Sequence, residues 1–383
     1  MDFELSMEQE ILRKTVRTFV EKEIAPVARE LDEAEEFSPE TMSAMGELGL
    51  FGMVVSEEYG GKGMDYISYI IAVEEIARVD GSHAATMGAG NSLGIGPIYY
   101  YGSENQKRKY LPDLCAGKAL WSFGLTEPNA GSDAGGAQTT AVLDGNEWVI
   151  NGSKIFITNA STAISRGVTV MAKTGNRVNG RKELSCILVE NGTRGFEAKP
   201  MYGKMMWRAS NTSELYFEDC RVPKDNLLGG RGKGFHQMLE TLDAGRLSVG
   251  AGGVGGAQGA YELALKYAKE RVQFGRPIST FQVNAFKLAD MAMEIEAARL
   301  LVYQACWLKD QHKSFSKAAA MAKLYASEVM GRVVNEAVQI HGGYGLMKEY
   351  SIERFYRDQK LLTIGEGTSE IQRLVIARLI GAI

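Results

Sequence analysis

The middle of the chain constrains the fold most, because short β-branched runs alternate there with tight-turn dipeptides and no helical period separates them. The runs that predict strands occupy residues 139–143, 147–150, 167–172, 185–189 and 214–217. The turn dipeptides are Asp144-Gly145, Asn151-Gly152, Asn179-Gly180 and Asn191-Gly192, which favour hairpins between antiparallel strands. A parallel nucleotide-binding sheet needs helices between its strands. A small antiparallel barrel or sandwich is therefore favoured for this segment.

Helical patterns precede this segment. Ser6 and Gln9 have the spacing of a capping box, and apolar residues follow at helical intervals as far as Pro26. Further helices are predicted over residues 42–50 and 66–78. Residues 1–116 are therefore predicted to form an N-terminal α-helical domain, and residues 117–228 a middle β domain.

The helical period returns after Gly234. Five apolar residues fall on one face of a long helix, namely Leu288, Met291, Ile295, Ala298 and Val302. A second helix, rich in small residues that allow close packing, is predicted over 318–337. Residues 229–383 are therefore predicted to form an antiparallel helical bundle. The predicted fold class is mainly α with a central β domain.

Composition argues against several classes of function. The chain has 383 residues, of which 23% are charged, and a net charge of −4, so no basic excess favours nucleic acid or an anionic membrane. No apolar run is long enough to span a bilayer and the N-terminus lacks a signal-peptide pattern, so a cytoplasmic protein is expected. The four cysteines are far apart and form no C-x-x-C, which argues against a metal site or a disulfide framework. They are expected to be small buried residues.

Two apparent motifs are given no chemical role. Residues 250–255 match G-x-G-x-x-G, but the dinucleotide fingerprint follows a strand, whereas residues 239–249 carry a helical pattern. Close helix packing is the preferred explanation. The four histidines are scattered and no G-x-S-x-G elbow accompanies them. His341 is of interest because Gly342 and Gly343 follow it, either as the end of a helix or as backbone that approaches a phosphate.

Residues 364–372 carry the strongest candidate for a catalytic group. Glu366 lies between Gly365 and Gly367, so its carboxylate can meet a ligand with nothing bulky beside it. An alternative is that the stretch only starts a helix, with Thr368 as its cap and Glu370 favouring the helix dipole. Residues 121–133, 154–159 and 271–277 form three further clusters of aromatic, hydroxyl and guanidinium groups. The last is suited to a pyrophosphate.

Six motifs, in order along the whole chain, resemble those of the acyl-CoA dehydrogenase family. They occupy residues 123–133, 154–159, 242–246, 271–282, 339–345 and 364–372. The resemblance implies that family's fold, with an N-terminal helical domain, a middle antiparallel β-barrel and a C-terminal four-helix bundle, usually assembled as a homotetramer. It also implies FAD as cofactor, an acyl-CoA as substrate, and electron-transferring flavoprotein as the protein that accepts the electrons.

The resemblance implies roles for individual residues. Glu366 matches the family's catalytic base. The residues expected to contact FAD, partly across a subunit boundary, are Phe123, Leu125, Thr126, Ser132, Phe156, Thr158, Arg271, Phe274, Gln282, Gln339, Gly342, Gly343, Thr368 and Glu370. The residues expected to contact the CoA thioester are Ser132, Asp243, Arg246 and Gly367. No metal ligand is expected.

The implied reaction is α,β-dehydrogenation of an acyl-CoA to the 2-enoyl-CoA. Glu366 would remove the α-proton, and the β-hydrogen would leave as hydride to flavin N5. The pKa of Glu366 is expected to be raised once the acyl chain excludes water. Some members of the family place the base immediately before the residue that matches Arg246. That residue is Gly245 here, which favours Glu366.

The local sequence is closest to the short-chain, butyryl-type branch. Gly365 stands where many linear-chain members carry Tyr, which leaves room for a branched, cyclic or aryl group. Met206 and Trp207 also depart from the family pattern, without an explanation from sequence. A glutaryl-type enzyme is disfavoured because residues 82–93 hold no Arg for a second carboxylate. A non-catalytic scaffold of the same fold is the alternative from another class, and the length favours a dehydrogenase over the longer oxidases.

Overall fold

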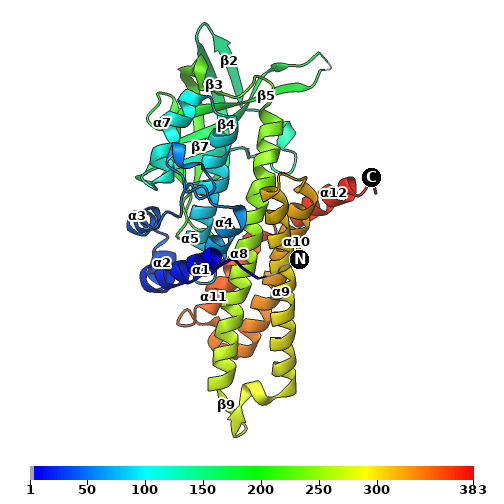
Figure 1. The fold of residues 1–383 in the computed structure, drawn as a ribbon. Helices are drawn as coiled ribbons and strands as arrows, with labels where there is room; N and C mark the ends of the chain where they lie inside the picture. The colour runs from blue at the N-terminus through cyan, green and yellow to red at the C-terminus, as the bar shows by residue number, and fades with distance from the viewer. Residues whose placement is uncertain (1–3, 179) are drawn as a thin grey trace.

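The computed structural model describes residues 4–178 and 180–383. Figure 1 shows an elongated molecule with the sheet at one end, long C-terminal helices running to the other end, and the N-terminal helices against their flank. The predicted fold class, mainly α with a central β domain, is confirmed.

The N-terminal part is helical, as predicted. Its helices are α1 (Met7–Phe19), α2 (Ala28–Ala34), α3 (Pro39–Glu47), α4 (Tyr66–Ala77), α5 (Gly81–Ala89), α6 (Gly96–Tyr101) and α7 (Glu104–Cys115), with π-helical turns at Val20–Ile24 and Gly90–Ile95. The predicted capping box is present, because the Gln9 N–H donates to Ser6 Oγ (3.2 Å) and the Ser6 N–H donates to Gln9 Oε1 (3.0 Å). The side chains of Asp65 and Asp80 cap α4 and α5, since each accepts from the backbone N–H three residues later.

The middle part is one sheet. Its strands are β1 (Leu120–Gly124), β2 (Thr140–Asp144), β3 (Glu147–Thr158), β4 (Ser165–Asn176), β5 (Lys182–Glu190), β6 (Phe196–Pro200), β7 (Thr212–Pro223) and β8 (Leu227–Leu228). The order is β6-β7-β3-β2-β4-β5-β8, with β1 beside β4. Most pairs are antiparallel, as predicted, but β1 and β2 each pair with β4 in parallel. In the described strands the hydrogen bonding runs from β6 to β8 without closing a ring.

Only some of the four predicted turns join the strands as expected. Asp144-Gly145 joins β2 to β3 in a hairpin, as predicted. Asn191-Gly192 is a turn after β5, although the following strand, β6, pairs with β7. The prediction for Asn151-Gly152 is wrong, because β3 continues through these residues with a register shift. A Cβ at Gly152 would lie 2.7 Å from Thr139 Oγ1, so this glycine permits a close approach of two strands. The Asn179-Gly180 prediction cannot be compared as a pair, since Asn179 lies outside the described residues.

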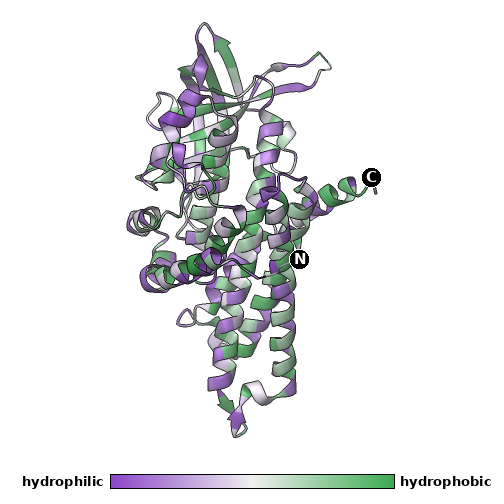
Figure 2. Ribbon diagram, viewed as in Figure 1, coloured by the Kyte–Doolittle hydropathy of each residue, from purple (hydrophilic) through white to green (hydrophobic). Residues whose placement is uncertain are grey.

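The C-terminal part consists of α8 (Gly234–Glu270), α9 (Gln282–Asp310), α10 (Ser316–His341), α11 (Ile352–Leu362) and α12 (Ser369–Leu379). A small hairpin of β9 (Val272–Gln273) and β10 (Arg276–Pro277) joins α8 to α9. Figure 2 shows hydrophobic and hydrophilic residues alternating along these long helices, as expected for helices that are buried on one side.

The G-x-G-x-x-G segment lies inside α8, as the packing interpretation predicted. Here α8 meets its neighbours backbone to backbone. A Cβ would lie 2.2 Å from the Glu74 carbonyl oxygen if added at Gly255, and 2.9 Å from that of Ala326 if added at Gly253. Only glycine allows such contact with α4 and α10, so α8 is held closely against both helices.

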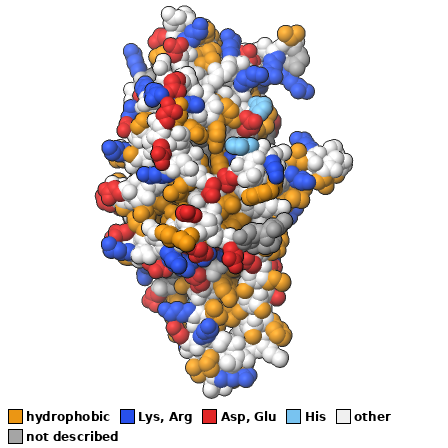
Figure 3. All heavy atoms as spheres, viewed as in Figure 1, with side chains coloured by type: hydrophobic (Ala, Val, Ile, Leu, Met, Phe, Trp, Pro, Cys, Tyr) orange, Lys and Arg blue, Asp and Glu red, His pale blue; other side chains and the backbone are white. Residues whose placement is uncertain are grey.

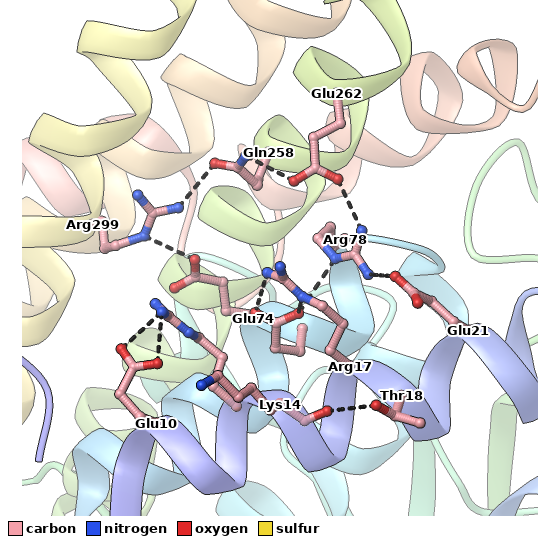
Figure 4. Close-up of polar contacts among 12 residues, drawn as sticks. Glu10, Lys14, Arg17, Thr18, Glu21, Glu74, Arg78, Gln258, Glu262 and Arg299 are labelled. Carbon is pink, nitrogen blue, oxygen red and sulfur yellow. Dashed lines mark hydrogen bonds and ion pairs between the residues drawn. The ribbon is translucent and has the colours of Figure 1, made fainter. Parts of the chain in front are cut away.

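A network of charges centred on the buried carboxylates of Glu74 and Glu75 joins α1, α4, α8 and α9 (Figure 4). Arg17 makes two 2.8 Å hydrogen bonds to the buried carboxylate of Glu75, and Arg78 contacts Glu75, Glu262 and Glu21. Arg299 of α9 donates to Glu74 (2.8 Å). Buried ion pairs contribute little net stability but penalise arrangements in which a partner is missing. This network therefore favours one placement of the N-terminal helices on α8.

The structure explains Trp207, which the sequence left unexplained. Its N–H donates to the buried carboxylate of Asp358 on α11 (2.8 Å), and its indole Nε1 lies 2.6 Å from the position of a Cβ at Gly81. Trp207 therefore connects the middle part of the chain to the N-terminal and C-terminal helices.

The expectation for the cysteines is confirmed, since Cys115, Cys186, Cys220 and Cys306 are all buried and free. Within residues 4–178 and 180–383, no helix is both long and apolar enough to cross a membrane.

Candidate functional site

Glu366 lies in the short loop between α11 and α12. Its backbone is left-handed (φ 52°), a conformation uncommon for residues other than glycine, and Gly367 follows at φ 95°. The alternative that this stretch only starts a helix is partly right, because Thr368 Oγ1 accepts from the Ile371 N–H (3.2 Å) and caps α12. Glu366, however, precedes the cap by two residues. Its side chain is therefore free of the helix end and points into the protein.

The Glu366 carboxylate lies directly over Gly245 of α8. A Cβ at Gly245 would be 2.1 Å from Glu366 Oε2 and 3.2 Å from Oε1, so the carboxylate occupies the space that a side chain would need. Oε2 is buried and has no hydrogen-bond partner among the described residues. Buried polar atoms are nearly always paired, so an unpaired carboxylate oxygen indicates a partner that arrives with a ligand.

The surroundings set the protonation of Glu366. Burial raises the pKa of this carboxyl to about 7, against the opposing effect of the positive charges on Lys323 and Arg246. The prediction of a raised pKa agrees with this, although the cause is the burial already present without an acyl chain. A carboxyl with a pKa near 7 can both take up and release a proton close to neutral pH.

Arg246 and Asp243 lie beside this carboxylate on α8. Arg246 is buried and forms an ion pair with Asp243, and Asp243 also accepts from Ser316 Oγ of α10 (2.6 Å). Arg246 Nε is buried without a hydrogen-bond partner in the described part of the chain. Of the four residues predicted to contact the CoA thioester, Asp243, Arg246 and Gly367 are thus brought together around Glu366, whereas Ser132 is exposed in the loop after β1.

A cavity of about 380 Å³ lies beside Asp243 and Ala244. Aromatic residues dominate its wall, namely Tyr66, Tyr69, Tyr99, Tyr100, Tyr101 and Phe315. Tyr69 is buried, and its hydroxyl donates to the Gly88 carbonyl (3.0 Å). Burial and, to a lesser degree, the nearby Glu366 charge raise the pKa of the Tyr69 hydroxyl. The cavity therefore combines an aromatic wall with polar and charged groups, Glu240, Asp243 and Lys309 among them, which suits a small molecule that carries polar groups.

The motifs predicted to surround the flavin ring are joined in the structure. Phe123 and Leu125 are buried at the end of β1, and the Ile155 N–H of β3 donates to the Thr126 carbonyl (3.0 Å). Lys154 Nζ donates to the Leu125 carbonyl (3.1 Å) and forms a buried ion pair with Glu127 (2.8 Å).

Two residues after Lys154, Phe156 has a left-handed backbone (φ 61°) and is 62% exposed, beside a register shift of β3. Thr158 is the last residue of β3 and half-buried. An exposed aromatic ring next to polar backbone fits the edge and face of a flat heterocycle.

The residues predicted to hold the adenine and pyrophosphate lie at the other end of the bundle. Arg271, Gly342 and Gly343 line one cavity of about 470 Å³, together with His341 and Tyr344. Gly342 ends α10 at φ 60°, and a Cβ on either glycine would meet nothing within 4 Å, so the backbone there is accessible to a ligand.

Phe274 (94% exposed), Gln282 and Gln339 lie near this end of α8, α9 and α10. Thr368 and Glu370 lie instead at the start of α12, beside Glu366. The predicted cofactor residues therefore form two separate groups in one protomer.

Three residues around the base were missed by sequence reasoning. Lys323 is fully buried and donates to the Gly367 carbonyl (2.7 Å), and Gln372 donates to the carbonyls of Glu366 (3.1 Å) and Gly367 (3.0 Å). Tyr69 faces the site from α4. The sequence did offer one indication of Lys323. It lies on the face of α10 that carries Ala319 and Ala326, and a charged residue is unusual on a face of small residues that packs against other helices.

Comparison with protein families identifies the class of this chain. Residues 6–118 match the acyl-CoA dehydrogenase N-terminal domain, residues 122–220 the middle domain, and residues 232–381 the C-terminal domain. The chain therefore belongs to the acyl-CoA dehydrogenase family, a family of oxidoreductases, as its motifs predicted.

Individual relatives agree along the whole length. A probable acyl-CoA dehydrogenase of Bacillus subtilis is 56% identical over 378 residues, which cover 99% of each chain. A short-chain specific acyl-CoA dehydrogenase of Clostridium acetobutylicum is 47% identical, over 98% of this chain and 99% of its own. The structure of butyryl-CoA dehydrogenase from Megasphaera elsdenii is 44% identical with a TM-score of 0.96, over 99% of this chain and 100% of that one.

Two further structures concern the cofactor and the partner. An acyl-CoA dehydrogenase from Bacillus anthracis, 39% identical with a TM-score of 0.93 over 99% of this chain and 68% of that one, is complexed with FAD. The predicted cofactor is thus the one that a related structure contains. A chain from a study of the electron transferring flavoprotein of Acidaminococcus fermentans is 47% identical with a TM-score of 0.96, over 99% of each chain.

Proposed function

We propose that this protein oxidises a short acyl-CoA to the 2-enoyl-CoA and that Glu366 is its catalytic base. The observation that supports this most is the placement of Glu366, whose carboxylate oxygen is buried, unpaired among the described residues and seated over Gly245. A pKa of about 7 suits a base that must take a weakly acidic α-proton near neutral pH. In this proposal Asp243, Arg246 and Gly367 contact the thioester end of the substrate.

FAD, when bound, supplies the acceptor for the β-hydride. The exposed ring of Phe156, the half-buried Thr158 and the backbone of Leu125 and Thr126 would hold its ring system, and the exposed Ser132 would lie at the rim. The cavity at Arg271, Gly342 and Gly343 would hold the phosphates and adenine, with a guanidinium and accessible backbone for the negative charge. These residues fit the cofactor, because both groups leave aromatic or glycine surface open.

The two groups serve different protomers in this proposal. Arg271 lies roughly 40 Å along α8 from Gly245, at about 1.5 Å per residue. One cofactor does not span that length within a protomer, so Arg271 would serve a flavin bound mainly by a neighbour. The exposed apolar residues of α9 support such an assembly, since Phe286, Met293, Leu300 and Trp307 recur every seventh residue. Figure 3 shows hydrophobic side chains along this flank of the bundle. The homotetramer and the cytoplasmic location stay predictions.

The acyl group is proposed to be short but wider than butyryl. The three heavy atoms nearest to a Cβ at Gly365 all belong to Leu361, at ordinary contact distances of 3.5–3.7 Å, so the position has room for a side chain. Gly365→Tyr is expected to lower kcat/KM for branched, cyclic or aryl acyl-CoAs by about tenfold or more, while butyryl-CoA is affected less. Equal losses for all substrates would contradict this assignment of Gly365.

Electron-transferring flavoprotein is the proposed acceptor. The related chain from the Acidaminococcus fermentans study supports it, as does the 383-residue length. Rapid reduction of added electron-transferring flavoprotein by the substrate-reduced enzyme is expected, and reoxidation by oxygen at the same rate would contradict the proposal.

The proposal is tested with the purified protein. We expect a yellow protein that bleaches anaerobically with at least one member of a panel of linear, branched, cyclic and aromatic acyl-CoAs. Glu366→Gln should bind FAD normally and bleach at least about 10²-fold more slowly, because a proton-transfer group contributes about 10²–10⁴-fold. Near-normal bleaching by Glu366→Gln would overturn the assignment of the base. A colourless protein, or one that no member of the panel bleaches, would favour the scaffold alternative, and bleaching by glutaryl-CoA alone would favour the glutaryl-type enzyme.

A further inference from the structure

Lys323 of α10 is a buried cation next to the proposed base. Its side chain has no exposed surface, and its ammonium donates to the Gly367 carbonyl (2.7 Å). Within the described chain, the group at hydrogen-bonding distance from this ammonium is a carbonyl, not a carboxylate. Burying an ammonium without a directly paired carboxylate is costly, so an apolar side chain of similar length would be the more stable choice for packing alone.

The hydrogen bond from Lys323 acts on the loop that carries Glu366. Gln372 of α12 donates to the carbonyls of Glu366 (3.1 Å) and Gly367 (3.0 Å), and Lys323 donates to the second of these from α10. Both carbonyls are therefore held in place by side chains of α10 and α12. With these peptide planes fixed, the left-handed backbone of Glu366 (φ 52°) directs its side chain over α8.

The titratable groups around Glu366 and Lys323 come from four helices, α4, α8, α10 and α12. Arg246 of α8 is already paired with Asp243, and Tyr69 of α4 is neutral because burial raises the pKa of its hydroxyl. Glu370 of α12 acts on Lys323 and favours its charged form, as Glu366 does. Lys323 is thus the cation near Glu366 whose charge is not committed to a direct ion pair in the described residues.

We propose that Lys323 is a positioning residue for Glu366, which fixes the Gly367 carbonyl behind the base and supplies a buried positive charge that favours the carboxylate form. This inference rests on the proposed role of Glu366. Burial lowers the pKa of Lys323 to about 8, so the side chain is still mainly protonated at neutral pH. In the protein with Lys323 charged, the Glu366 carboxyl ionises near pH 7, and without that charge burial would raise its pKa further.

The test separates the charge from the hydrogen bond. Lys323→Met removes both, and Lys323→Gln removes the charge but keeps a donor. The first readout is the ionisation of Glu366 in the FAD-loaded protein without substrate, followed by ¹³C NMR of carboxyl-labelled glutamate and assigned by its loss in Glu366→Gln. We expect both Lys323 variants to raise the pKa of Glu366 by about one pH unit, the effect of removing one nearby opposite charge.

The second readout is the pH dependence of the bleaching rate. A rise of about one pH unit from pH 7 leaves roughly fivefold less carboxylate at pH 7, and the loss should disappear above about pH 9 for Lys323→Gln. Lys323→Met should keep an additional loss at high pH, because its Gly367 carbonyl is no longer held.

Lys204→Gln is the matched control. Lys204 is a largely buried lysine that also donates to a backbone carbonyl, that of Trp207 (2.9 Å), and burial lowers its pKa to about 8. Lys204→Gln should change the thermal stability but leave the pKa of Glu366 at its wild-type value.

The outcomes are distinguishable. If Glu366→Gln bleaches normally, the proposed function fails. If Glu366 is required but neither Lys323 variant moves its ionisation, or if Lys204→Gln moves it equally, the inference about Lys323 is overturned. Should Lys323→Met fail to fold, Lys323→Gln decides alone, since it keeps a polar contact to the loop.

Discussion

Gly245→Ala is the most direct test of how the site is built. The added Cβ would lie 2.1 Å from Glu366 Oε2 and 2.9 Å from the carboxyl carbon, whereas real Cβ contacts are essentially never below 3.0 Å. The carboxylate must therefore move by about 1 Å, and a displacement of this size costs on the order of 10²-fold in rate. Because the displaced atoms are the end of a flexible side chain, the fold itself should accept the change.

The same substitution should slightly stabilise α8. Alanine is favoured over glycine in a helix interior by about 0.8–1.0 kcal/mol, so Gly245→Ala should lose rate without losing its cooperative unfolding. Gly252→Ala is the control, because it lies on the same helix and its Cβ would meet nothing within 4 Å. The assay is the anaerobic bleaching rate of FAD-loaded protein, with thermal unfolding measured on the same samples. A Gly245→Ala protein within about threefold of wild-type rate would refute the placement of Glu366.

Three further predictions concern stability. Burial raises the pKa of Glu366 from 4.5 to about 7, so as the pH rises the unfolded chain releases this proton before the folded chain does, and the wild type loses stability between about pH 4.5 and 7. The free energy of unfolding of Glu366→Gln, measured by denaturant titration, should therefore rise relative to that of the wild type by on the order of 3 kcal/mol between pH 4 and pH 8. A difference that stays constant with pH would contradict the buried carboxyl. Gly81→Ala places a Cβ 2.6 Å from Trp207 Nε1 and should cost about 1–3 kcal/mol, partly recovered when Trp207 is also replaced by Leu; an unchanged unfolding midpoint would show that the indole moves freely. Lys154→Met removes the cation beside the buried carboxylate of Glu127, which keeps only the backbone N–H donors of Gln138 (2.6 Å) and Thr139 (3.0 Å), and should cost about 3–5 kcal/mol. The cost should be smaller when Glu127→Gln is combined with it, and equal losses in the single and double variants would argue against the pair.

The sequence was sufficient where local physics decides the structure. The capping box at Ser6 and the Asp144-Gly145 hairpin are set by neighbours a few residues away, and both are present. Asn151-Gly152 has the same local signature, but its glycine is required by Thr139, which lies just before the neighbouring strand β2. A dipeptide cannot show which of these two demands it meets, so the turn was wrongly predicted.

The site residues also fall into those that the sequence identified and those that only the packing of the helices shows. Glu366 was identifiable because its glycine neighbours are adjacent in the chain, and the family motifs then brought Asp243 and Arg246 with it. Lys323 and Tyr69 reach Glu366 only through the packing of α10 and α4 on α8. Lys323 is marked only as a charge among small residues on one face of its helix, and Tyr69 lies in an ordinary helical segment, so neither shows which residue it will meet. Their positions follow from the tertiary contacts, which a single sequence does not contain.

The glycine face of α8 also determines how this sequence can vary. Gly253, Gly255 and Gly259 meet neighbouring backbone or side chains at distances that exclude any Cβ, whereas a Cβ at Gly252 would point into open space. In proteins that descend from this one, Gly253, Gly255 and Gly259 should therefore be kept, whereas Gly252 should be replaced freely. The apparent dinucleotide fingerprint needs Gly252, so it would vanish from such descendants while the helix contacts that produced the rest of it persist.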